Sequence, residues 1–243
     1  MNDISIRGII FDKDGTLIKF DSFWRPVTEK AVMYILRKTK MPLELKDELM
    51  TVSGINDGIS GLICRGTYSQ LARAFEKVLE KYRKNVGDIE SITIEAFTRS
   101  MPAGEIVPVC AGIEELFSKL KKSGYMIFLV TTDRREITKK CLDELRLKEF
   151  FDEIYTDDGR GYSKPDPYYI NMIAEQYGLK KNELIMVGDT VTDMEFAVNG
   201  GIRAIAVASD AESRCILKKY TDTVIDDISY LTKLLGDRGV DGA

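Results

Sequence analysis

The sequence contains no histidine, and this absence excludes several kinds of active site. Histidine is the usual general base of serine and cysteine hydrolases, and it supplies the imidazole ligands of many zinc sites. A chain without histidine can build neither arrangement. Any catalysis by this protein of 243 residues must therefore use carboxylates, lysine or hydroxyl groups.

Cysteine pairs, excess positive charge and long apolar runs are also absent. The four cysteines, Cys64, Cys110, Cys141 and Cys215, form no CxxC pair, which argues against a zinc knuckle, a redox motif or a disulfide framework. A net charge of -4 provides no general basic field for nucleic acid or anionic lipid. No apolar run approaches the roughly 18 residues of a membrane span, and the apolar run near the N-terminus is too short for the hydrophobic region of a secretory signal. We therefore expect no nucleic-acid or membrane partner and a cytoplasmic location.

Short apolar runs alternate with helical patterns over most of the chain. The runs occupy residues 8–11, 125–130, 153–156, 183–188 and 204–208. Uninterrupted apolar runs of this length are typical of parallel strands that are buried on both faces. From residue 111 onward, each run is followed by apolar residues at helical spacing. The pattern predicts an α/β fold with a doubly wound, Rossmann-like parallel sheet.

The segment after the first strand breaks this alternation. Apolar residues spaced three and four apart recur through residues 18–103, as expected for a small helical bundle. Pro102 and Pro108 lie where the chain returns to the sheet. We predict a catalytic core of residues 1–17 and 104–243, with a helical cap domain of residues 18–103 inserted into it.

Polar residues follow four of the predicted strands, at the end of an open α/β sheet where ligands bind. They are Asp12 and Asp14, then Thr131 and Thr132, then Lys164, and finally Asp189 and Asp193. Clustered aspartates without histidine form an oxygen site that suits Mg²⁺. An ammonium and a hydroxyl group suit a phosphate. The pattern therefore predicts magnesium-dependent chemistry on a phosphate group.

Asp12 and Asp14 are separated by a single residue in "FDKDGTL". Residues two apart in an extended segment point to the same side, so both carboxylates can face one substrate. Asp12 is suited to act as a nucleophile, because a metal and a lysine would offset the repulsion between its carboxylate and a negatively charged phosphoryl group. Asp14 can give a proton to the leaving alkoxide and then deprotonate a water. Gly15 permits a sharp turn out of the strand.

Four motifs in this order resemble those of the haloacid dehalogenase superfamily, in particular its phosphoglycolate phosphatase-like branch with a helical cap. They are "FDKDGTL", Thr131 in "FLVTTD", Lys164 in "SKPDP" and "GDTVTD". The resemblance implies that Asp12 is both nucleophile and metal ligand. It implies that Asp14 is the general acid/base and a metal ligand through its backbone carbonyl, and that Asp189 is the main further ligand.

The same resemblance implies roles for the remaining motif residues. Thr131, Thr132 and Lys164 would hold the phosphate, and Asp193 would steady Lys164 or a water molecule bound to the metal. Gly15, Thr16 and Gly188 would support the site.

Two further aspartates and three residues of the cap have roles that the resemblance does not assign. Asp133 stands where many members of the superfamily have asparagine, and we expect it, like Asp166, to cap the helix that follows. In the cap, Trp24, Arg25 and Arg65 are candidates for contact with the substrate when the cap closes. An aromatic cluster at helical spacing, however, more often packs in a core.

The leading interpretation is a Mg²⁺-dependent phosphatase that acts on a small phosphorylated metabolite through an aspartyl phosphate. A phosphomutase of the β-phosphoglucomutase type would pass the phosphoryl group to its substrate instead of water, and a dehalogenase would not need Asp14 as an acid. Two non-enzyme alternatives are a phosphorylated receiver domain, which would be smaller and lack the insertion, and an inactive binding protein, which would be expected to have lost a motif residue. The sequence names neither the metabolite nor the oligomeric state.

Overall fold

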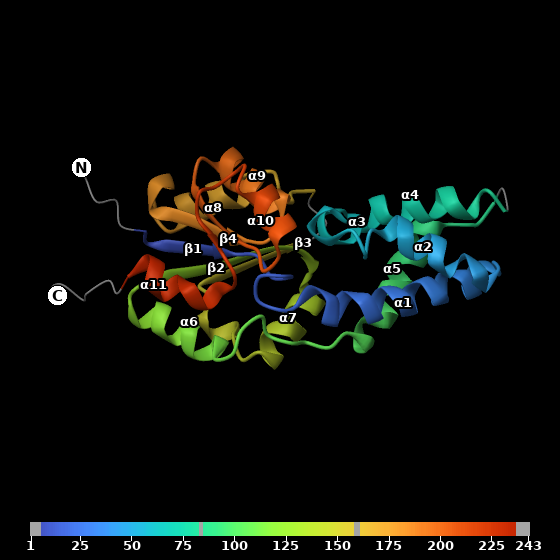
Figure 1. Cartoon of the computed structure of the whole chain (residues 1–243), viewed down its shortest axis with the longest axis horizontal. Helices are drawn as coiled ribbons and strands as arrows, with labels where there is room; N and C mark the ends of the chain where they lie inside the picture. Colours follow the sequence, from blue (N-terminus) through green and yellow to red (C-terminus); the bar gives the residue numbers. More distant parts are fainter. Residues whose placement is uncertain (1–5, 83–84, 158–160, 237–243) are drawn as a thin grey trace. The chain divides into compact units, whose positions relative to one another are not determined.

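The computed structural model describes residues 6–82, 85–157 and 161–236, and the chain forms two compact units (Figure 1). The breaks between the units fall after Lys19 and after Val107, two and four residues later than the predicted boundaries. Ile18 belongs with the sheet unit because it forms bridges to Asp14 and to Pro108. At the other break, Glu105 N donates a hydrogen bond of 3.1 Å to the Ser22 carbonyl within the helical unit.

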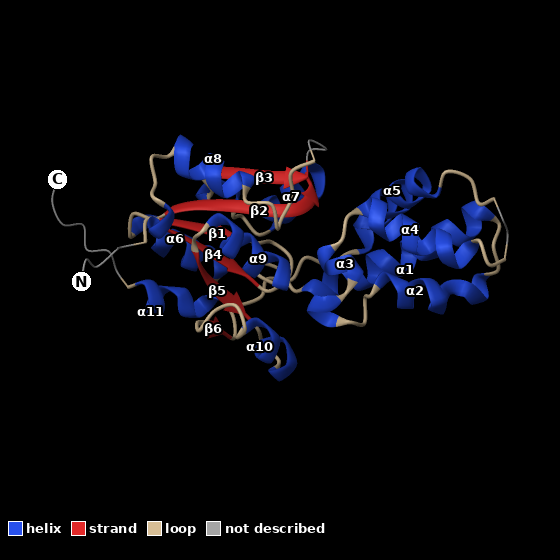
Figure 2. Cartoon of the chain, turned by 90° about the horizontal axis from the view of Figure 1, so that it is seen from above, coloured by secondary structure: helices blue, strands red, loops and turns tan. Residues whose placement is uncertain are grey.

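The first unit is built on a parallel sheet. Among the described residues the strand order is β3-β2-β1-β4-β5-β6, and every neighbouring pair is parallel (Figure 2). The strands are β1 (Gly8–Phe11), β2 (Met126–Arg134), β3 (Glu153–Asp157), β4 (Leu184–Gly188), β5 (Arg203–Val207) and β6 (Val224–Ile225). This is the order of a doubly wound sheet. The predicted α/β fold is confirmed.

Helices cover both faces of this sheet (Figure 1). They are α6 (Ile113–Lys122), α7 (Arg135–Glu144), α8 (Tyr168–Gln176), α9 (Val191–Gly200), α10 (Ala211–Leu217) and α11 (Leu231–Leu235). Ile10 packs with Ile170 of α8 and Phe196 of α9. The next residue, Phe11, packs on the other face against Phe117 of α6, with ring centroids 5.0 Å apart. Because β1 is buried on both faces, its sequence is an unbroken apolar run.

Two strands differ from the sequence-based prediction. β2 continues past residue 130 to Arg134, so Thr131, Thr132 and Asp133 belong to the strand, and its register against β3 shifts between Val130 and Arg134. β6 was not predicted, because two residues are too few to show a pattern.

The second unit consists of helices and connecting loops, with no strand among its described residues. Its helices are α1 (Phe20–Thr39), α2 (Lys46–Ser53), α3 (Leu62–Arg65), α4 (Tyr68–Leu79) and α5 (Ile89–Ser100). α5 lies against both α1 and α4. Two of the helices begin with side-chain caps: Thr67 and Gln70 form a capping box on α4, and Asp88 caps α5. In the part of the chain that the structure describes, no helix combines the length and the apolar character needed to cross a membrane.

Candidate active site

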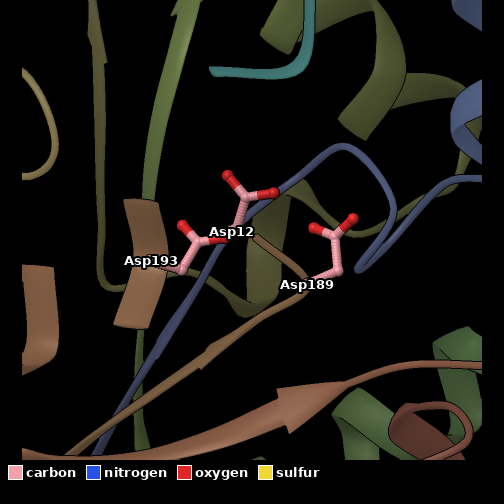
Figure 3. A group of neighbouring side chains, drawn as sticks. All are labelled: Asp12, Asp189 and Asp193. Atoms are coloured by element: carbon pink, nitrogen blue, oxygen red, sulfur yellow. The ribbon is translucent and has the colours of Figure 1, made fainter. Parts of the chain in front are cut away.

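Three aspartates meet at the carboxyl ends of β1 and β4 (Figure 3). Asp12 directly follows β1, Asp189 directly follows β4, and Asp193 lies in the first turn of α9. One carboxylate oxygen of each lies within 4.8 Å of the others. Asp12 N donates a hydrogen bond of 2.9 Å to the Val187 carbonyl of β4. Strand pairing therefore brings together carboxylates that are far apart in the sequence.

Lys164 is buried between two of these aspartates. Its Nζ forms ion pairs with Asp12 Oδ1 and with Asp193 Oδ1, the latter over 2.6 Å. Asp193 Oδ2 accepts hydrogen bonds from the backbone N and from Oγ1 of Thr190, at 3.0 and 2.7 Å. The first of these bonds belongs to the capping box of α9. Both oxygens of Asp193 are thus engaged by protein groups.

The cluster carries more negative than positive charge. Burial raises the pKa of Asp12 to about 7, although the Lys164 ammonium opposes this shift. Burial, together with the charges of Asp12 and Asp193, also raises the pKa of Asp189 well above its ordinary value. Burial lowers the pKa of Lys164, but the charges of Asp12 and Asp193 outweigh this effect and raise it. A divalent cation would balance the excess charge, so these carboxylates fit a site for a hard metal ion.

The loop after β1 lies directly against these acids. Gly15 has a φ of +82°, and a Cβ at this position would overlap Asp189 Oδ2. Thr16 is fully buried, and its hydroxyl donates a hydrogen bond of 3.3 Å to Asp189 Oδ1. At the end of β4, a Cβ on Gly188 would come within 2.5 Å of Asp193 Cγ. Only glycine fits both close approaches without displacing a carboxylate.

Gly15→Ala is expected to impair metal binding as well as stability. The new methyl group displaces Asp189, and a residue other than glycine at this positive φ costs about 1–3 kcal/mol. We expect the free energy of unfolding to fall by about that amount, and an added divalent cation to stabilise the variant less against thermal unfolding than it stabilises the wild type. Gly124→Ala is the matched control, because Gly124 has a φ of +79° with no atom within 4 Å of its added Cβ. It should lose stability and keep the response of the wild type to the cation; an unchanged response to the cation in Gly15→Ala would contradict the prediction.

The carboxyl end of β2 supplies Thr131, Thr132 and Asp133. Thr131 is buried, and its Oγ1 accepts a hydrogen bond of 3.2 Å from Asp133 N, whereas Thr132 is partly exposed. The prediction that Asp133 caps a helix was wrong, because Asp133 lies buried in β2 and no side chain caps the N-terminus of α7. Asp166 does accept a hydrogen bond from Tyr168 N, the first residue of α8, over 2.9 Å.

Lys13 is a buried residue of this region that we did not predict. Its Nζ lies 2.6 Å from Asp14 Oδ1 and 2.9 Å from Asp133 Oδ2. Burial raises the pKa of Asp133 to about 7; the Lys13 ammonium opposes this shift and the Asp14 charge adds to it. The available signal was a lysine between two aspartates directly after a buried strand. The carboxylate of Asp14 thus contacts a lysine, and it is outside the group of three carboxylates that could hold a metal.

The three cap candidates lie in the helical unit. Trp24 is buried there, edge-on to Phe23 with ring centroids 5.3 Å apart. Arg25 donates a hydrogen bond of 2.9 Å to Asn56 Oδ1. Arg65 is exposed at the end of α3. Trp24 therefore packs within its own unit, and contact of any of the three with substrate stays a prediction.

The chain belongs to the haloacid dehalogenase-like hydrolase family, because a model of that family matches residues 6–201. The resemblance inferred from the four motifs is thereby confirmed, as is the prediction that the protein is an enzyme. Within the enzymes, the family places it among the hydrolases.

Individual relatives cover nearly the whole chain. Pyrophosphatase PpaX from Bacillus cereus is 27% identical over 236 residues, which are 96% of this chain and 98% of that protein. A solved structure described as a predicted phosphoglycolate phosphatase from Haemophilus somnus has a TM-score of 0.73 at 18% identity, covering 95% of this chain and 98% of that one. YfnB from Bacillus subtilis, solved with bound magnesium, has a TM-score of 0.70 at 19% identity, covering 96% and 99%. At these identities the two structures share the fold.

Proposed function

We propose that this hydrolase is a Mg²⁺-dependent phosphatase that acts on a small phosphorylated metabolite through an aspartyl phosphate on Asp12. The observation that carries the proposal is the group of Asp12, Asp189, Asp193 and Lys164, of which all but the partly exposed Asp189 are buried. It combines a nucleophile, ligands for a hard cation and an ammonium for phosphoryl oxygens. The names of two relatives, a pyrophosphatase and a predicted phosphoglycolate phosphatase, support an activity on phosphate compounds.

Asp12 and Asp189 would hold the Mg²⁺, with the backbone carbonyl of Asp14 as a third ligand. We assign Asp193 to positioning Lys164, because both of its oxygens already accept hydrogen bonds from protein groups. The magnesium bound to YfnB, which shares this fold, supports the choice of metal. When bound, the cation would neutralise charge between the Asp12 carboxylate and the phosphoryl oxygens of the substrate.

The chain's own side chains would then carry out two displacement steps. A carboxylate oxygen of Asp12 attacks phosphorus, while Lys164 and the Thr131 hydroxyl bind phosphoryl oxygens, with Thr132 beside them. Asp14 gives its proton to the leaving oxygen as the phosphorus-oxygen bond breaks. The carboxylate of Asp14 next takes a proton from the water that attacks the aspartyl phosphate. Inorganic phosphate leaves, and both aspartates return to their starting states.

The substrate can be a phosphomonoester or a phosphoanhydride. The phosphoglycolate phosphatase name supports the first class and the pyrophosphatase name supports the second. A phosphomutase would use the same first step and differ only in the acceptor of the phosphoryl group. The products therefore distinguish these functions.

Phosphate release from a panel of substrates tests the proposal. The panel contains phosphoglycolate, inorganic pyrophosphate, sugar phosphates and p-nitrophenyl phosphate. We expect the purified protein to release inorganic phosphate from at least one of them with Mg²⁺, to lose this activity in EDTA, and to regain it with excess Mg²⁺. An isomerised sugar phosphate without free phosphate would establish the mutase instead. Turnover that is unaffected by EDTA would contradict the metal dependence.

A further inference from the structure

Asp14 contacts a buried lysine, just as Asp12 does. Lys13 Nζ lies 2.6 Å from Asp14 Oδ1, and 2.9 Å from Asp133 Oδ2 at the end of β2. The same acid-lysine-acid arrangement connects Asp12 through Lys164 to a second aspartate. The arrangement around Lys164 serves the proposed nucleophile, whereas the arrangement around Lys13 has no role in the steps described above.

The burial of Lys13 is not explained by stability alone. Its side chain is fully buried, while those of Asp133 and Asp14 are 8% and 18% exposed. Lysine is almost never fully buried unless it is paired, and a buried ion pair commonly stabilises a protein no better than apolar side chains of the same volume. An apolar side chain could fill this position without the desolvation cost. A functional reason for the charge is therefore indicated.

The backbone of Lys13 and the position of its partner Asp133 are both fixed by the fold. The Lys13 carbonyl accepts hydrogen bonds from Leu17 N and Ile18 N, at 2.8 and 3.2 Å, which hold the loop after β1 in a tight turn. Asp133 is on β2, which pairs directly with β1 in the sheet. The loop backbone and the neighbouring strand thus fix the position of Nζ, and Nζ in turn holds one oxygen of Asp14.

We propose that Lys13, anchored by Asp133, is a positioning residue for Asp14. It holds Asp14 through Oδ1 and so presents Oδ2, the oxygen that would carry the proton, to the leaving oxygen of the substrate. This inference rests on the proposed function, in which Asp14 is the general acid. Its distinguishing consequence is a dependence on the leaving group: a poor leaving group needs proton donation in the transition state, and a good one needs it much less.

Two aryl phosphates of similar shape measure this dependence. Phenyl phosphate and p-nitrophenyl phosphate differ by one nitro group, and phenol is the weaker acid and the poorer leaving group. We expect Lys13→Met to lose about tenfold more kcat/KM on phenyl phosphate than on p-nitrophenyl phosphate. Asp14→Asn should show at least as large a difference. Adding Lys13→Met to Asp14→Asn should not enlarge the difference, because Lys13 acts through Asp14.

A second variant covers the case in which Lys13→Met does not fold, since that change leaves the buried Asp133 carboxylate without its cation. Asp133→Asn preserves the shape and removes the anchor of Lys13, and we expect the same preferential loss on phenyl phosphate, with a smaller ratio. Leu142→Ala is the matched control: it opens a cavity in α7, which packs on β2, and should affect both substrates equally.

Equal losses on the two substrates in the folded variants, or no loss, would overturn the positioning role. Failure of the proposed function has a different signature, because the wild-type protein would then release no phosphate in an Asp12-dependent reaction from any compound of the panel or from phenyl phosphate. That result is seen before any Lys13 variant is compared.

Discussion

Asp12→Asn is expected to reduce phosphate release by about four to six orders of magnitude, because the amide that replaces the carboxylate cannot attack phosphorus. Asparagine has nearly the same shape and removes one negative charge from a cluster of three carboxylates, two of which are buried. Since burial already raises the pKa of Asp12 to about 7, we expect no loss in the free energy of unfolding at neutral pH. We therefore expect Asp12→Asn to lose activity while it stays as stably folded as the wild type.

Steady-state phosphate release and chemical denaturation, measured on the same preparations, test this prediction. Asp210→Asn is the matched control, because Asp210 caps α10 through a hydrogen bond of 2.8 Å from Ser213 N, and asparagine caps helices equally well. It should keep wild-type activity. Activity of Asp12→Asn within tenfold of the wild type would remove Asp12 from the role of nucleophile.

Lys164→Met is expected to have the largest effect on stability. Without the ammonium, Asp12 and Asp193 remain buried as neighbouring carboxylates that lack their shared cation. Breaking a buried ion pair by removing one partner costs about 3–5 kcal/mol, and we expect the free energy of unfolding without metal to fall by that amount. Phosphate release should fall at least 100-fold as well, because Lys164 also binds the phosphoryl oxygens.

The destabilisation by Lys164→Met should depend on pH in a defined direction. In the wild type the pKa of Asp12, about 7, is higher than its ordinary value of 3.8, so Asp12 is mostly protonated at pH 5 and mostly charged at pH 8. Lys164 lowers this pKa, so its ammonium stabilises the charged form of Asp12 that prevails at pH 8. Lys164→Met should therefore lower the free energy of unfolding more at pH 8 than at pH 5. Urea denaturation at the two pH values measures the difference.

Lys139→Met is the control for this measurement. Lys139 forms an ion pair of 3.3 Å with Asp143 on the surface of α7, and its side chain is 63% exposed. Exposed pairs contribute little, so this variant should differ from the wild type by less than about 1 kcal/mol at both pH values. An equally small effect for Lys164→Met would show that Lys164 is not the cation that holds the buried acids.

Much of the fold could be predicted from the sequence because strands buried on both faces consist of uninterrupted apolar residues. β1, β4 and β5 were found to within one residue of their ends, since Gly8–Phe11 and the later runs are bounded by polar residues or turns. The end of β2 was missed because Thr131, Thr132 and Asp133 are polar. Their place in the strand depends on pairing with the neighbouring strand, and a single segment does not contain that information.

The sequence analysis named residues of the candidate site but not the contacts between them. Asp12, Lys164, Asp189 and Asp193 were named from their positions after the strands, and the structure brings them together. The position of Lys13 between two aspartates did not show that its side chain is buried or that its second partner is Asp133, which lies more than a hundred positions later in the chain.

The sequence by itself determined which residues can carry the chemistry. With no histidine, the candidates after the strands are aspartates, Lys164 and threonines, and their order along the chain identifies the family. The tertiary structure alone decided which charged side chains form ion pairs with one another. β1 lies between β2 and β4, so Asp14 shares its lysine with Asp133 from one neighbouring strand, while Asp12 lies beside the acids that follow the other. The pairing of charges is a property of strand order, and strand order is fixed by packing across the whole sheet.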